Sequence, residues 1–288
     1  MKFLVTGSAG LVGTQVVKDL IDQNHIVYSG YHKTTPIHGI ITKLDLTNLD
    51  SLKIIIDKIN PDVIIHLAAL TGVDLCETEQ VLAKTINVCA TKILAQQAAK
   101  NDSFFVYVST DYVFDGNSTM KKESDTPNPL GFYGKSKLEG ELSLNDLASG
   151  WCIVRTSTPF GFHPAKKSFP IWIKENLELK KEISVLTDQF TSPTYVPNLS
   201  QMIIEIAMRQ ISGIIHLAGA TRISRYDLAI LVAEKLNLDK TLLIPTKIDE
   251  MNWKAQRPKD SSLDVSLAIE VLEEKPQKIE YSFNLFFS

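Results

Sequence analysis

A glycine-rich turn near the start of the chain constrains the fold more than any other feature of the sequence. Residues 2–6 form an apolar run typical of a buried strand, and residues 16–21 carry apolar side chains at helical spacing. Gly7, Gly10 and Gly13 lie between them in the pattern Gly-x-x-Gly-x-x-Gly. A strand, a glycine turn and a helix in this order form the first unit of a dinucleotide-binding fold, because the glycines let the backbone approach a pyrophosphate at the helix N-terminus. A plain glycine turn between a strand and a helix is the alternative.

Strand-like and helix-like segments alternate through the first half of the chain. The expected strands are residues 25–30, 40–44, 63–67, 104–109 and 151–156, and the expected helices are residues 49–59, 81–100 and 133–147. Such alternation predicts a parallel sheet with right-handed crossovers. The predicted fold class is therefore α/β, a Rossmann-type doubly wound parallel sheet with a smaller C-terminal substrate-binding lobe.

The alternation loosens after residue 157. An apolar run at residues 213–217 still resembles a strand of the main sheet. We expect residues 1–157 to form the NAD(P)-binding domain, with a return of the chain near residues 187–217, and residues 158–288 to form mainly the substrate-binding lobe.

Composition excludes several kinds of partner. The net charge is −3 and the sequence has no long basic run, so neither nucleic acid nor a membrane surface is an expected partner. No apolar stretch reaches the roughly 18 residues of a membrane span, and the apolar start is too short for a signal peptide. Cys76, Cys89 and Cys152 form no metal or disulfide pattern. We therefore expect a cytoplasmic protein.

The segment after the second expected strand bears on the choice of cofactor. Sites that prefer NAD place a carboxylate there to bind the adenosine ribose. Here the segment is Tyr31-His32-Lys33-Thr34-Thr35, which contains no acid. Lys33, with His32, could instead face a 2′-phosphate, which favours NADPH over NADH without excluding NADH. A solvated surface lysine is the alternative.

The ends of the third and fourth strands supply further cofactor candidates. Asp45, followed by Leu46, could contact the adenine or could cap the next helix. The small residues Ala68, Ala69 and Thr71 would let a cofactor lie close to the backbone. The complete set of predicted cofactor-binding residues is Gly7, Gly10, Leu11, Val12, Gly13, His32, Lys33, Asp45, Leu46, Ala68, Ala69, Thr71, Tyr133 and Lys137.

Catalytic candidates follow the fifth strand. Residues 104–109 lead to Thr110 and Asp111, where a parallel sheet opens its ligand crevice. Tyr133 and Lys137 come later at a spacing of four, which places them on one face of a helix. An ammonium group lowers the pKa of a nearby phenol, which can then exchange a proton near neutral pH. A Tyr-x-x-x-Lys match alone is weak, and an ordinary helix pair is the alternative.

Several motifs together resemble one protein family. They are Thr6-Gly7-x-x-Gly10-x-x-Gly13, Ser109-Thr-Asp-Tyr-Val-Phe-Asp-Gly116, Tyr133-Gly-Lys-Ser-Lys137 with Gly140-Glu141, Val154-Arg-Thr-Ser157, Asp188-Gln189 with Ser192-Pro193-Thr194, and Arg257-Pro258. In this order they resemble the extended short-chain dehydrogenases/reductases and, among them, the dTDP-4-dehydrorhamnose reductase family. That family reduces the 4-keto group of a nucleotide-linked 6-deoxysugar.

The resemblance implies roles for individual residues. Tyr133 would donate a proton to the carbonyl, and Lys137 would lower its pKa and bind the nicotinamide ribose. Thr110 would hydrogen-bond the substrate oxygen, and Asp111 would face the sugar. Arg257 would contact the substrate diphosphate, with a surface arginine as the alternative. The candidate substrate-binding residues are Val73, Thr110, Asp111 and Arg257.

The chain also departs from the family pattern. The Arg-Thr-Ser run is usually followed by a Trp expected to stack near the sugar, but Thr158 occupies that position here. This leaves the substrate open, and we find no counterpart of the acidic residues with which some members bind a metal, so no metal is expected. The expected partner is the nucleotide-linked keto-sugar, and the chain is expected to be a monomer or homodimer.

Two other functions remain open at this point. One is a non-catalytic, NADP-binding regulatory subunit resembling that of methionine adenosyltransferase. The other is a nucleotide-sugar epimerase or dehydratase, for which Asp111 would be the acidic residue beside the catalytic threonine.

Overall fold

Seven parallel strands form the main sheet of the computed structural model, which describes residues 1–145, 147 and 150–288. The strands are β1 (Lys2–Thr6), β2 (Ile26–Tyr31), β3 (Ile40–Lys43), β4 (Val63–His66), β5 (Phe104–Thr110), β6 (Trp151–Thr156) and β11 (Gly213–His216). Their order is β11-β6-β5-β4-β1-β2-β3. The chain builds β2 and β3 on one side of β1 and then crosses to build β4, β5 and β6 on the other. Sheets of this kind bind ligands outside the carboxyl ends of the strands at such a reversal.

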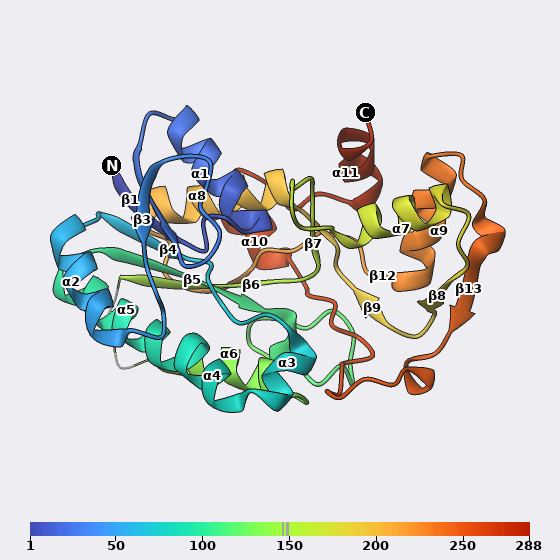
Figure 1. The fold of residues 1–288 in the computed structure, drawn as a ribbon, viewed down its shortest axis with the longest axis horizontal. Coiled ribbons are helices and arrows are strands. Elements are labelled where there is room, and N and C mark those ends of the chain that lie inside the picture. Colours follow the sequence, from blue (N-terminus) through green and yellow to red (C-terminus); the bar gives the residue numbers. More distant parts are fainter. Residues whose placement is uncertain (146, 148–149) are drawn as a thin grey trace.

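Helices cover both faces of this sheet (Figure 1). The helices on one face are α1 (Leu11–Asp22), α8 (Val196–Arg209) and α10 (Ser266–Val271), and those on the other are α2 (Leu49–Ile59), α5 (Ala90–Lys100) and α6 (Phe132–Leu142). Buried apolar side chains of the strands form a separate cluster on each face. This arrangement confirms the predicted α/β, Rossmann-type fold. Within the described residues, no helix combines the length and the apolar character needed to span a bilayer.

Three short helical segments connect β4 to α5. They are α3 (Val73–Thr78), α4 (Gln80–Lys84) and the π-helical turn η1 (Thr85–Cys89). The turn η1 continues directly into α5, so most of the helix predicted at residues 81–100 is present but contains a π-helical turn. Such turns are frequent at functional sites.

A smaller lobe lies beside the sheet (Figure 1). Its main elements are α7 (Phe169–Glu178), α9 (Arg225–Lys235), α11 (Ile279–Phe286), β8 (Ile183–Leu186) and β13 (Leu243–Thr246). β8 and β13 pair in parallel, and apolar side chains from all five elements share one buried cluster. The short segments are β7 (Pro159–Phe160), β9 (Phe190–Thr191), β10 (Thr194–Tyr195), β12 (Ile223–Ser224) and the 3₁₀ turns η2 (Asp111–Val113), η3 (Lys240–Leu242) and η4 (Ile248–Glu250).

The chain passes between the lobe and the main sheet more than once. β11 pairs with β6, as predicted for the apolar run at residues 213–217. α10 then contributes Ala268 to the cluster on the α1 face of the sheet. The division of the chain after residue 157 stays a prediction.

A buried histidine ties two strand ends to a helix at the edge of the ligand crevice. His66 Nδ1 lies 2.7 Å from Thr6 Oγ1, and His66 Nε2 lies 3.0 Å from Thr91 Oγ1. Because the Thr91 hydroxyl donates to the Asn87 carbonyl, His66 Nε2 carries the proton and Nδ1 accepts from Thr6. Burial lowers the pKa of His66 to about 3, so the ring is neutral at physiological pH.

We expect this histidine to make the free energy of unfolding fall in mild acid. The folded pKa of about 3 lies below the usual 6.5, so the unfolded chain binds more protons between these values and stability is lost as pH falls through that window. From pH 6.5 to pH 5 the loss from this group should be about 1.5 kcal/mol. Urea unfolding of wild type and His66→Gln at both pH values measures it, and equal pH slopes for the two proteins would contradict it.

Candidate active site

A cavity of about 490 Å³ lies at the reversal of strand order, between the glycine turn and the ends of β2, β3 and β4. The predicted cofactor residues that line it are Gly7, Gly10, His32, Lys33, Asp45, Leu46, Ala68, Ala69 and Thr71. Those that do not line it are Leu11, Val12, Gly13, Tyr133 and Lys137. The structure thus brings most of these residues, which are scattered in sequence, to one cavity.

The glycine turn is a close-fitting cradle. Gly7 has a φ of +67°, and a Cβ there would lie 2.8 Å from the backbone nitrogen of Ala68. A Cβ on Gly13 would lie 2.2 Å from the carbonyl oxygen of Gly7. No side chain caps the N-terminus of α1, which begins at Leu11, so its backbone N–H groups are available to an anion. The cradle therefore fits the diphosphate of a dinucleotide.

The end of the cavity lined by residues 31–34 and 44–47, where the adenosine of a dinucleotide is expected, is mainly basic. His32 and Lys33 line it, and the only acid among its lining residues is Asp45. His32 Nε2 lies 3.5 Å from Asp45 Oδ2, while Asp45 Oδ1 accepts hydrogen bonds from the backbone and hydroxyl of Thr47. These bonds to Thr47, more than the nearby His32, lower the pKa of Asp45. Asn48, not Asp45, caps α2.

One basic residue of this cavity was not predicted from the sequence. Lys166 follows β7 and belongs to the second half of the chain, yet it lines the cavity. Its Nζ lies 3.8 Å from the position of a Cβ on Gly10. His163 Nδ1 accepts hydrogen bonds from the backbone N–H groups of Ala165 and Lys166, which shapes the turn that carries Lys166. No motif marks this lysine, so only the folded chain shows that it faces the cradle.

The predicted catalytic residues meet at the end of β5. The Thr110 hydroxyl donates to Asp111 Oδ1 at 2.9 Å and accepts from the backbone N–H of Tyr112. Tyr133 lies in the first turn of α6, with its ring centroid 6.0 Å from that of Tyr112. Burial raises the pKa of Tyr133 above its usual range, and a hydrogen bond with Thr110 opposes this shift. The tyrosine is thus protonated and faces the threonine hydroxyl.

Lys137 points away from the expected partner. Its Nζ donates to the carbonyl oxygen of Val108 at 2.8 Å and lies 4.0 Å from the ring centroid of Tyr107. Burial lowers the pKa of Lys137 to about 7, although Glu141 opposes the shift. The lysine is not among the main influences on the pKa of Tyr133, so the predicted lowering of that pKa by the ammonium is not seen in this arrangement.

A buried ion pair lies one helical turn beyond Lys137 along α6. Glu141, one helical turn after Lys137, bonds Arg155 through two nitrogens, with Nη2 and Oε2 2.7 Å apart. The Ser109 hydroxyl also donates to Glu141. Both charged side chains are nearly sealed from solvent, with exposed fractions of 3% and 2%. The pair joins α6 to β5 and β6, and the sequence marked it only as part of two family motifs.

A buried polar chain continues from Asp111 into the lobe. The Ser157 hydroxyl donates to Asp111 Oδ2 at 2.7 Å and lies 3.2 Å from the Thr191 hydroxyl. Burial raises the pKa of Asp111, while hydrogen bonds from Ser261, Ser157 and Thr110 lower it. Asp111 is therefore held by groups from both parts of the molecule.

The π-helical turn links the cofactor cavity to the catalytic helix. Asn87 accepts a hydrogen bond from the backbone of Leu70, which lines the cavity, and donates to the Ser136 hydroxyl. Ser136 in turn donates to the carbonyl oxygen of Tyr133 at 2.8 Å. The sequence showed only that Asn87 lies in a helical pattern, and its role in joining these segments depends on the fold.

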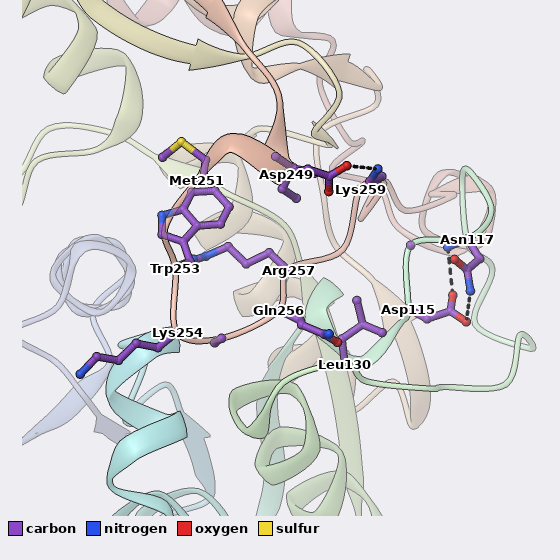
Figure 2. Close-up of a pocket in the computed structure, with 13 residues that line it drawn as sticks. Asp115, Asn117, Leu130, Asp249, Met251, Trp253, Lys254, Gln256, Arg257 and Lys259 are labelled. Atoms are coloured by element: carbon purple, nitrogen blue, oxygen red, sulfur yellow. Dashed lines mark hydrogen bonds and ion pairs between the residues drawn. The ribbon is translucent and has the colours of Figure 1, made fainter.

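Arg257 lies beside a second cavity, of about 390 Å³ (Figure 2). Its guanidinium carbon lies 3.8 Å from the ring of Trp253, and its Nη2 bonds Asp74 Oδ2 at 3.0 Å. Asp74 also accepts the backbone N–H of Ala255. Only 14% of the Arg257 side chain is exposed, so it is not a free surface arginine. Val73, the first residue of α3, precedes Asp74 but lines neither cavity.

The described residues contain no candidate metal site. Over residues 1–145, 147 and 150–288, no group of three or more His, Cys, Asp or Glu side chains has an arrangement that could hold an ion.

Comparison with known proteins extends over nearly the whole chain. A family model described as the RmlD substrate binding domain matches residues 1–287. The chain is 35% identical over 280 residues to a dTDP-4-dehydrorhamnose reductase of Aggregatibacter actinomycetemcomitans, covering 92% of this chain and 91% of the relative. It is 31% identical over 271 residues to methionine adenosyltransferase 2 subunit beta of Xenopus tropicalis, covering 91% and 80%.

A solved structure shows the same similarity. The dTDP-4-dehydrorhamnose reductase of Bacillus anthracis, solved in complex with NADP, superposes with a TM-score of 0.90 at 30% identity. The alignment covers 99% of this chain and 98% of that one.

The glycine cradle yields a prediction about dinucleotide binding. In Gly13→Ala the new Cβ would lie 2.2 Å from the Gly7 carbonyl oxygen, so the turn must shift away from α1. We expect the Kd for NADPH, measured by calorimetry, to rise at least about 10-fold, since the N–H groups of the cradle lose their alignment. Lys18→Ala is the control because it changes an exposed side chain of the same helix, away from the turn. Unchanged binding by Gly13→Ala would show that the cradle does not hold the dinucleotide.

Proposed function

The chain belongs to the dTDP-4-dehydrorhamnose reductase family of the extended short-chain dehydrogenases/reductases, and we propose that it reduces the 4-keto group of a nucleotide-linked 6-deoxysugar with NADPH. One observation carries the proposal. Thr110 and Tyr133 lie together at the carboxyl end of β5, and hydrogen bonds through Asn87 and Ser136 join Tyr133 to a cavity whose glycine cradle fits a dinucleotide diphosphate. The family predicted from the motifs is confirmed by the match over residues 1–287.

Each of these residues has a distinct part in the proposed reaction. The Thr110 hydroxyl and the Tyr133 phenol converge on the place where a carbonyl oxygen would lie, and protonated Tyr133 donates the proton to that oxygen. Lys137, with a pKa of about 7, exchanges protons near neutral pH, and binding ribose hydroxyls would require that its Nζ share or leave the Val108 carbonyl. When bound, NADPH supplies the hydride.

The nucleotide part of the substrate is assigned to the second cavity. Trp253 offers an aromatic face there, and Arg257 offers a guanidinium that matches phosphate geometry (Figure 2). Arg257 is paired with Asp74 in this structure, so contact with a diphosphate requires that it share or leave this partner. Val73 and Asp111 complete the proposed substrate-binding set.

NADPH is proposed as the cofactor and NADH as the less favoured alternative. Lys33 and His32 line the adenosine end of the cavity, where a 2′-phosphate would need positive charge. Asp45, the acid among the lining residues, accepts hydrogen bonds from Thr47 and lies close to His32. The Bacillus anthracis reductase with the same fold was solved with NADP.

We propose that the protein acts in the cytoplasm as a monomer or homodimer, without nucleic-acid or membrane partners. Its three cysteines form no disulfide, which suits a reducing compartment. The regulatory-subunit hypothesis keeps one supporting observation, the 31% identity to methionine adenosyltransferase 2 subunit beta. Turnover of the keto-sugar by the purified chain separates the two, because a purely regulatory subunit would bind the dinucleotide without oxidising NADPH.

Tyr133→Phe tests the assignment of the proton donor. We expect kcat for NADPH oxidation with dTDP-4-dehydrorhamnose to fall about 10²- to 10⁴-fold, because the phenol proton is lost. The Kd for NADPH should stay within a factor of about three, a bound set by the small change in the cavity. Tyr195→Phe, which removes a phenol in the lobe cluster, is the matched control. A Tyr133→Phe enzyme as fast as wild type would show that the donor is another group.

Lys33→Ala tests the cofactor assignment. Loss of a charge-assisted hydrogen bond to a 2′-phosphate should raise KM for NADPH roughly 10-fold or more and leave KM for NADH unchanged. Lys53→Ala, which removes an exposed lysine of α2, is the control. Parallel steady-state assays with both cofactors measure the effect. Equal changes for NADPH and NADH, or a wild-type preference for NADH, would remove the role of Lys33.

A further inference from the structure

Arg225 is a partly buried positive charge hydrogen-bonded to Thr158, and it has no ion-pair partner among the residues that the structure describes. The chain has five arginines, and Arg155, Arg209, Arg222 and Arg257 each form a salt bridge. Among the described residues Arg225 forms none. It is half-buried at the first position of α9, and the ring of Phe169 lies 4.9 Å from its guanidinium carbon. A partly buried cation without a partner is costly, so a ligand is the natural source of its acceptor.

The guanidinium makes a single hydrogen bond to the described residues. Its Nη2 donates to the Thr158 hydroxyl at 3.3 Å. A few polar side-chain atoms of the described residues are sealed from solvent and have no hydrogen-bond partner. The other guanidinium nitrogens of Arg225 do not belong to this group. Its other N–H groups are therefore not sealed from solvent and can donate to a bound molecule.

Thr158 connects Arg225 to the catalytic residues. Its hydroxyl lies 2.7 Å from that of Thr191, which belongs to the buried chain that leads through Ser157 to Asp111. The charge of Arg225 also lowers the pKa of Asp111, and it lowers that of Tyr112. Arg225 is thus linked by a chain of hydroxyl groups to Asp111, and its charge acts on Asp111 and Tyr112 beside the proposed carbonyl site.

The backbone of Thr158 is strained. Its φ is +42°, a region that β-branched residues avoid. Such a conformation is energetically unfavourable and is found mostly where the surrounding structure holds a residue for function. Thr158 also occupies the position where the family pattern has a tryptophan expected to stack near the sugar. A small hydroxyl side chain there leaves the guanidinium in reach of the sugar, which a tryptophan would cover.

We propose that Thr158 and Arg225 form a polar sugar subsite, in which the guanidinium donates hydrogen bonds to an oxygen substituent of the sugar ring in place of aromatic stacking. The inference rests on the proposed function, since it names the part of the substrate that this crevice recognises. The acceptor is a ring hydroxyl or a carboxylate, both of which fit a guanidinium fork. Arg225 is then a specificity-determining residue, distinct from Arg257, which is assigned to the diphosphate.

Binding of sugar and sugar-free ligands tests the subsite. Calorimetry on the NADP-loaded protein gives Kd for dTDP, dTDP-glucose and dTDP-glucuronate in wild type and Arg225→Met. We expect Arg225→Met to weaken one or both sugar ligands roughly 10- to 100-fold and to leave dTDP unchanged, since hydrogen bonds from a charged donor are lost. A loss with dTDP-glucose assigns a hydroxyl acceptor, and a loss confined to dTDP-glucuronate assigns a carboxylate. An equal loss for dTDP, or no loss at all, overturns the proposal.

Two further variants guard against a structural artefact. Thr158→Val keeps the β-branched shape and the backbone strain but removes the hydroxyl that orients Arg225, and we expect it to weaken the same sugar ligand several-fold. Lys235→Met, at the exposed end of the same helix, should change no Kd. Sugar affinity that is unaffected by Thr158→Val, or weakened equally by Lys235→Met, contradicts the subsite. Turnover of dTDP-4-dehydrorhamnose by wild type judges the proposed function separately, so failure of the subsite is distinguishable from failure of that function.

Discussion

The buried ion pair between Glu141 and Arg155 sets the geometry on which the active site depends. It fastens α6 to β6, and through Ser109 to β5, at the level of the catalytic lysine. Breaking such a pair by removing one partner leaves an uncompensated charge and costs about 3–5 kcal/mol. The pair also lies one helical turn from Lys137, whose pKa Glu141 raises against the effect of burial. It therefore controls both the position of α6 and the charge balance within it.

The cofactor half and the substrate half of the crevice rely on different groups to bind their ligands. The cofactor half depends on the backbone, because the glycine cradle and the uncapped N-terminus of α1 present N–H groups without any side chain. The substrate half depends on charged side chains. Arg257 is paired with Asp74, while Arg225 has no acidic partner within the part of the chain that the structure describes. The first half suits a constant cofactor. The second half can change its specificity through single side chains.

Local patterns were sufficient to predict the sheet, the glycine turn and the cluster of Thr110, Tyr133 and Lys137, because each depends on neighbours in sequence or on the shared edge of parallel strands. The direction of Lys137 was not predictable, since the carbonyl of Val108 becomes its partner only when β5 and α6 meet. Lys166 reaches the cofactor cavity from the second half of the chain. Such contacts between distant segments leave no periodicity and no motif, so they appear only in the fold.

The departure from the family motif coincides with a strained backbone position. Thr158 breaks the family pattern in sequence, takes a φ of +42°, and is hydrogen-bonded to Arg225, which has no ion pair among the described residues. Sites where local rules fail together are expected to be functional, because folding stability alone would remove such costs. Thr110, Tyr133 and Lys137 remain together beside it. The retention of all three residues is the basis for proposing an enzyme with altered sugar recognition over a binding protein that has lost its chemistry.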